Sequence, residues 1–113
     1  MRAAVDPASL DRMFFALADV RRRGMLDRLG RGPASVTELA EPLGIALPLA
    51  VKQLALLEQG GLVASQKVGR VRTYRLEPRA FDAMEAWVAR RKAQLNAQFD
   101  QLDAYLSETK SRK

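Results

Sequence analysis

The chain has 113 residues, with 19 Lys and Arg against 13 Asp and Glu, and it contains no Cys and no His. A hydrophobic fraction of 48% and a charged fraction of 28% are typical of one folded domain over residues 1–113 rather than of a disordered chain. Without Cys and His there are no disulfides, thiolate zinc sites, cysteine nucleophiles or imidazole bases. A site built from carboxylates alone stays open, but no paired acidic cluster stands out. We therefore expect that the protein is not an enzyme and that it holds neither a cofactor nor a metal ion.

The net charge of +6 favours a polyanionic partner, although charge alone says nothing about the fold. No stretch reaches the ~18 apolar residues of a membrane span. The N-terminal segment MRAAVDPASLDRM lacks the apolar core of a signal peptide. We therefore expect a cytoplasmic protein.

Two helices are predicted in the first thirty residues or so. Asp6-Pro7 resembles an N-cap followed by proline at the first helical position. Asp19 is the expected cap of the second helix, which ends at Gly30–Pro33. The basic run Arg21–Arg23 is equally consistent with a solvated face and with contacts to phosphates. Phe15 lies off the apolar stripe of the first helix, which is formed by Leu10, Met13, Phe14 and Leu17.

Residues 37–60 have the spacing of a helix-turn-helix. Thr37 is the expected N-cap of a short helix that Gly44 ends, and Pro48 lies near the start of the next helix. Gly60-Gly61 end this second helix. Its predicted buried stripe consists of Leu47, Ala50, Val51, Leu54 and Leu57.

After the helix pair the apolar period changes from that of a helix to that of a strand. Residues 62–68 and 71–76 are predicted strands, with Gly69-Arg70 as the turn between them. A hairpin directly after the second helix of such a pair is a wing. We therefore expect a wing over residues 62–76.

A long helix is predicted over residues 79–107, after Pro78. Apolar residues recur on it every seven positions, and a second row widens the surface. This helix either folds back over the core or forms a dimer interface, and we favour the dimer because two apolar rows exceed the need of so small a domain. The expected dimer interface consists of Leu10, Phe14, Phe15, Phe81, Trp87, Val88, Leu95, Phe99, Leu102 and Leu106.

The expected fold is mainly α with a small β-hairpin: a winged helix-turn-helix with five helices and a long C-terminal dimerisation helix. The stretch from Phe15 to Leu76 resembles the ArsR-type family of bacterial winged helix-turn-helix repressors. The matching segments are Ala16–Asp19 with Arg22-Arg23, Thr37–Ala40, Leu47-Pro48, Gln53-Leu54, Leu57-Glu58, Gly61–Val63 and Lys67–Leu76. The resemblance implies a regulator of transcription, acting as a repressor and binding double-stranded DNA sequence-specifically, as a homodimer on an inverted-repeat operator.

The chain departs from the family's metal sensors, which carry paired Cys near the position of Thr37 or His and acidic ligands on the final helix. It is therefore similar to a non-metal-sensing branch, and no metal partner is expected. A small-molecule or protein effector stays open. The alternative function is a winged-helix module for protein–protein contact without sequence-specific DNA binding.

The resemblance implies that the helix beginning near Leu47 enters the major groove of DNA. Gln53 suits adenine, Lys52 suits guanine or phosphate, and Leu49 suits a thymine methyl group. Side chains of the wing are expected to reach backbone phosphates or the minor groove. The complete set of expected DNA contacts is Ala46, Pro48, Leu49, Lys52, Gln53, Lys67, Arg70 and Arg72.

Overall fold

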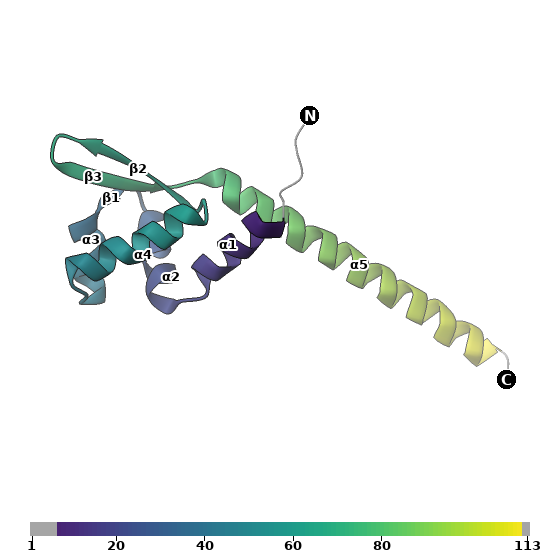
Figure 1. The fold of residues 1–113 in the computed structure, drawn as a ribbon. Coiled ribbons are helices and arrows are strands. Elements are labelled where there is room, and N and C mark those ends of the chain that lie inside the picture. Colours follow the sequence, from purple (N-terminus) through teal and green to yellow (C-terminus); the bar gives the residue numbers. More distant parts are fainter. Residues whose placement is uncertain (1–6, 112–113) are drawn as a thin grey trace, which may run out of the picture. The chain divides into compact units, whose positions relative to one another are not determined.

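The computed structural model describes residues 7–111, and the chain divides after Asp82 into two compact units. The elements in chain order are α1 (Pro7–Leu17), α2 (Val20–Leu29), β1 (Ala34–Ser35), α3 (Val36–Ala40), the 3-10 turn η1 (Glu41–Leu43), α4 (Leu47–Gln59), β2 (Val63–Val68), β3 (Val71–Leu76) and α5 (Pro78–Ser111) (Figure 1). The first unit contains every element up to β3 and the first residues of α5, and the rest of α5 forms the second unit. The predicted fold class, with five α-helices in the described part and a wing, is confirmed. The single domain over residues 1–113 stays a prediction.

Short polar side chains begin α2 and α3. Asp19 caps α2 as predicted, because its carboxylate accepts hydrogen bonds from the backbone N–H groups of Arg21 (3.0 Å) and Arg22 (3.2 Å). The hydrogen bond from Arg22, then that from Arg21 and the charges of both side chains, hold the pKa of Asp19 below its usual value. The predicted cap Asp6 of α1 lies outside the described residues, and Pro7, the first of these, is part of α1.

The cap of α3 differs from the prediction. Ser35, not Thr37, is the N-cap: its hydroxyl accepts from the N–H of Glu38 at 3.3 Å, and its own N–H donates to the Glu38 carboxylate at 2.8 Å. These two bonds form a capping box, which requires the acidic residue three positions after the cap. Thr37 has no acid at that spacing, so the chain enters the helix two residues earlier.

The wing belongs to a three-stranded antiparallel sheet with the order β1-β3-β2. The sequence predicts only the hairpin, since the two residues of β1 are too few for a period to show; they pair Ala34 with Tyr74. The hairpin register runs from Val63↔Leu76 to Val68↔Val71. The turn is therefore Gly69-Arg70, as predicted, and only Gly69 has a positive φ (64°), the pattern of a type II′ turn.

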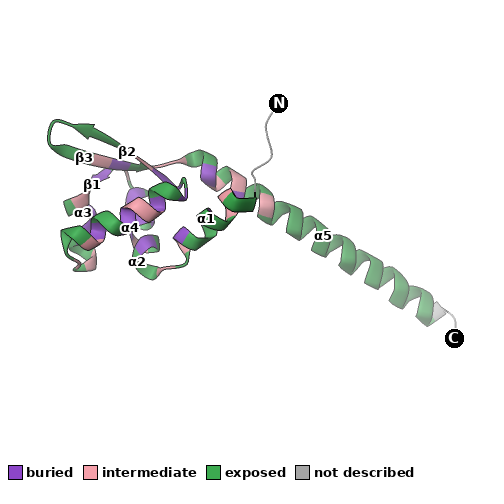
Figure 2. Ribbon diagram, in the orientation of Figure 1, coloured by how far each residue is buried: buried purple, intermediate pink, exposed green. Residues whose placement is uncertain are grey.

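The core of the first unit forms around α4, which packs against α1, α2, α3 and β2. Figure 2 shows the buried residues gathered along these elements and the adjoining sheet. Fully buried side chains include Met25, Leu39, Leu54, Leu57 and Leu62. This arrangement fixes which side of α4 faces outward.

Helix α5 has 34 residues, about a turn more than predicted at its C-terminal end. Each residue described from Val88 to Lys110 is exposed, including the apolar ones (Figure 2). No single helix in the described part of the chain has the length and hydropathy needed to cross a membrane, and only the bent pair Val36–Leu43 and Leu47–Gln59, angled at 110°, satisfies that test by length and composition.

The approach of α1 to the end of α4 depends on Gly60. A Cβ at this position would lie 2.9 Å from the backbone oxygen of Arg12 and 3.1 Å from the Cβ of Ala16. Because backbone cannot move aside cheaply, we expect Gly60→Ala to lower the free energy of unfolding by about 1–3 kcal/mol, measured by urea denaturation. The control is Gly24→Ala, whose Cβ meets only the flexible tip of Leu43 at 3.2 Å and which should leave stability equal or higher. Equal stability of Gly60→Ala and the parent would contradict this packing.

Candidate nucleic-acid interface

The outward face of α4 differs from the predicted one. The buried residues of α4 are Ala50, Gln53, Leu54 and Leu57, and they define its inward face. Leu47 and Val51, predicted to be inside, are 49% and 50% exposed, whereas Gln53, predicted to face outward, is 7% exposed. These three predictions of burial are wrong. The buried stripe contains an amide in place of two aliphatic side chains.

The reason is a buried arginine. Arg22 is 7% exposed, and its Nη1 donates to Oε1 of Gln53 at 2.7 Å. Its Nε donates to the backbone oxygen of Ala16 (2.7 Å) and its Nη2 to that of Phe15 (3.0 Å), both in the last turn of α1. The guanidinium also lies 5.2 Å from the centroid of the Phe15 ring. A buried cation needs such partners, and Gln53 supplies the one from α4.

The other two arginines of the basic run Arg21–Arg23 also make contacts where α1 meets α2. Arg23 donates from Nη1 to the backbone oxygen of Leu17 at 2.7 Å, and Arg21 lies 3.8 Å from the carboxylate of the cap Asp19. Cations at the C-terminal end of α1 are favoured by its unpaired carbonyls and by the helix dipole. The two roles considered for this run from the sequence were a solvated face and contacts to phosphates. Neither of them includes these contacts between α1 and α2.

The wing is linked to α4 by side chains. Arg72 on β3 donates from Nη1 to the hydroxyl of Ser65 on β2 at 2.8 Å, and this hydroxyl donates to Oε2 of Glu58 at 3.0 Å. Glu58 lies in the last turn of α4. Sequence reasoning missed Ser65 and Glu58, because the three residues belong to different elements and share no periodic pattern. Arg72, predicted to contact DNA, also holds the wing against α4.

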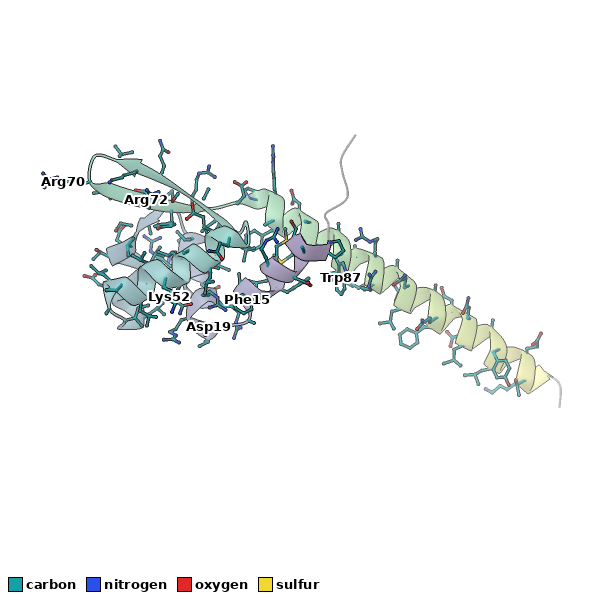
Figure 3. All side chains as sticks on the ribbon, viewed as in Figure 1. Phe15, Asp19, Lys52, Arg70, Arg72 and Trp87 are labelled. Atoms are coloured by element: carbon teal, nitrogen blue, oxygen red, sulfur yellow. The ribbon has the colours of Figure 1, made fainter. Side chains whose placement is uncertain are left out.

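The remaining predicted contacts lie at the start of α4 and near the wing tip. Ala46 is the N-cap of α4, with no side-chain capping bond; it is exposed, as is Pro48, while Leu49 is half-buried. Figure 3 shows Lys52 on α4 and Arg70 at the tip of the hairpin. Both are exposed, as is Lys67.

The charge of this surface is of one sign along most of α4. Between Leu47 and Leu57 the helix contains no acidic residue, and Lys52 is its one cation. Within residues 7–111 no three carboxylates come close enough to hold a metal ion together. The surface formed by α4 and the wing tip therefore suits an anion with an extended shape.

The predicted dimer residues fall on both units. In the first unit, Phe14 and Phe15 are 39% and 59% exposed, and Leu10 and Phe81 are half-buried. On α5, Trp87 is half-buried, and the guanidinium of Arg91 lies 4.5 Å from the centroid of its ring. The exposed apolar residues further along α5 are Val88, Leu95, Phe99, Leu102, Tyr105 and Leu106.

Comparisons with known proteins agree with this arrangement. The profile of a family described as a helix-turn-helix domain matches residues 17–66. The HTH-type transcriptional regulator Rv2034 of Mycobacterium tuberculosis is 38% identical over 76 residues, which are 67% of this chain and 71% of that protein.

Solved structures show the same fold. The ArsR family transcriptional regulator RHA00566 is 45% identical with a TM-score of 0.77, over 83% of this chain and 97% of its own. An ArsR-like transcriptional regulator from Rhodococcus sp. RHA1 is 32% identical with a TM-score of 0.74, over 84% and 90%. The homodimeric winged helix-turn-helix DNA-binding domain Mb0332 of Mycobacterium bovis is 29% identical with a TM-score of 0.62, over 83% and 94%.

The helix pair, the wing and these likenesses define a winged helix-turn-helix protein. The chain belongs to the ArsR family of transcriptional regulators. The resemblance stated from the sequence is thus confirmed. So is the expectation that the chain is not an enzyme, because the family consists of regulators.

Arg22 should dominate the stability of the α1–α2–α4 corner. Arg22→Ala removes the partner of two backbone oxygens and of Gln53, so we expect the free energy of unfolding to fall by about 2–4 kcal/mol. Arg21→Ala, which removes an exposed ion pair, should change it by less than about 1 kcal/mol. Urea denaturation of both variants gives the comparison, and similar losses for the two would refute the role of Arg22.

Proposed function

We propose that two copies of this chain bind double-stranded DNA sequence-specifically and repress transcription by occupying an operator with inverted repeats. In this proposal α4 enters the major groove of each half-site, and the wing reaches the backbone beside it. The observation that carries it is the exposed start of α4, which has a cation but no acid, in the same unit as the cationic wing tip.

The proposed contacts are narrower than those predicted from the sequence. Lys52, Lys67 and Arg70 are exposed and are assigned to phosphates or base edges. Gln53 is removed from the set, because its carbonyl oxygen accepts from Arg22 within the core. Arg72 is assigned a positioning role through Ser65.

A homodimer is supported by the apolar surface of α5. Val88, Leu95 and Leu102 are spaced by seven residues, and Phe99 and Leu106 form a second row of the same repeat. Each of these side chains is 44–55% exposed. The homodimeric relative from M. bovis has the same fold, and a two-fold axis would present two copies of α4 to successive turns of DNA.

Repression follows in this proposal from occupation of a promoter, in the cytoplasm where bacterial DNA is. Because the chain has no Cys and no His, we propose that it does not sense metals through thiolate or imidazole ligands. The alternative function is a winged-helix module for protein contact. No comparable observation supports it, because it does not explain the exposed cations of α4 and the wing.

Binding to DNA should depend strongly on salt, and the dependence should report on individual cations. We expect Lys52→Ala and Arg70→Ala each to weaken binding to a 30-bp duplex and to reduce the slope of log K against log [salt] by about 0.9 for every phosphate that is no longer neutralised. Arg12→Ala is the control, since Arg12 lies on α1 beside the C-terminal end of α4. Fluorescence anisotropy between low and high salt measures the slopes. An unchanged affinity and slope for both variants would remove these residues from the interface.

The dimer should depend on one face of α5. We expect Leu95→Glu and Leu102→Glu to convert the protein from dimer to monomer at micromolar concentration, because each places a charge in the apolar seam. Ala97→Glu introduces the same side chain on the opposite face of the helix and should leave the dimer intact. Sedimentation equilibrium distinguishes these states. A parent protein that stays monomeric, or a dimer that tolerates both substitutions, would contradict the proposed interface.

A further inference from the structure

The part of α4 assigned to the major groove is mostly apolar. Leu47 and Val51 lie one helical turn apart, and each exposes about half of its surface. The exposed Pro48 lies beside them, and Ala55, one turn after Val51, is half-buried. Lys52 is the one side chain of this face, within residues 46–55, that can donate or accept a hydrogen bond from an exposed position.

This composition limits how α4 can read bases. Recognition of guanine, adenine and cytosine in the major groove relies on hydrogen bonds with polar side chains, of which Arg, Lys, Asn, Gln, Asp and Glu are the usual ones and Ser and Thr also take part. Gln53 is the amide of this helix nearest its start, and its oxygen is bound to Arg22. The C5-methyl group of thymine is the apolar feature of the major groove, and aliphatic side chains contact it directly.

We propose that Leu47 and Val51 form an apolar site for thymine methyl groups, so that the chain selects A·T-rich half-sites by contact rather than by hydrogen bonds. This inference rests on the proposed function, since it specifies what α4 reads in the groove. It replaces the sequence-based assignment of the methyl contact to Leu49, which is half-buried. Lys52 then supplies the polar contact at the edge of the site.

A duplex with thymines is the occupant that the charges favour. The apolar pair lies on a helix whose first eleven residues carry one cation and no acid. The wing of the same unit adds exposed Lys67 and Arg70. An apolar pair on a stretch of helix that carries one cation and no acid complements a methyl-bearing polyanion better than it complements an ordinary protein surface, which carries both signs of charge.

Exchange of thymine for uracil tests the site, because it removes the methyl group and keeps the pattern of hydrogen-bond donors and acceptors. The probes are a 30-bp duplex of alternating A·T and the same duplex with deoxyuridine at every thymidine. We expect the 113-residue chain to bind the thymine duplex about 3- to 10-fold more tightly, as burial of about one or two methyl groups implies. Anisotropy at fixed salt measures both affinities.

Variants then assign the preference to α4. The double variant Leu47→Ala with Val51→Ala should bind both duplexes with nearly equal affinity, and circular dichroism should show it folded because both positions are exposed. Val20→Ala, at an apolar residue of α2 that is 70% exposed, should keep the full preference.

The outcomes separate the two proposals. Salt-dependent binding to both duplexes with equal affinity would overturn the thymine site, leave DNA binding intact and assign the apolar face to another occupant such as a protein. A preference that survives in the double variant would also overturn it. Failure to bind either duplex at low salt would overturn the proposed function itself.

Discussion

The arrangement of the first unit depends on one buried guanidinium. The hydrogen bonds of the Arg22 guanidinium all go to neutral oxygens, two from the last turn of α1 and one from Gln53 on α4. A buried cation that forms no direct ion pair is stable only if its N–H groups find acceptors, so the three helices must meet at fixed positions around it. Loss of any of these oxygens leaves a buried donor unpaired, which costs more than the bond itself contributes.

This constraint determines which surface of α4 is available. With Gln53 turned inward, Leu47, Val51 and Lys52 turn outward. The wing is attached to the same helix at its other end, through Glu58, Ser65 and Arg72. A core interaction thus fixes the rotation of α4, and a chain of surface hydrogen bonds fixes the wing that accompanies it.

The sequence predicts the order of elements well, because each has a local signal. Asp19 caps α2, and Gly69-Arg70 form the turn of the hairpin as expected. Local signals fail where the interaction partner is distant in sequence. Gln53 is 31 residues from its partner Arg22. Apolar periodicity therefore assigns this polar residue to the surface, although its hydrogen bond places it in the core. The cap of α3 was missed for another reason, since both Ser35 and Thr37 are good caps and only the acid at position 38 distinguishes them.

Gln53 belongs to the core, and the adjacent Lys52 is the residue that we assign to the proposed DNA interface. The most direct test compares Gln53→Leu with Lys52→Met for unfolding free energy and for affinity to thymine-containing duplexes. We expect Gln53→Leu to lower stability while the folded protein keeps its affinity and base preference. Lys52→Met should instead weaken binding while stability and the preference for thymine are kept. A stable Gln53→Leu protein with altered base preference would contradict these assignments.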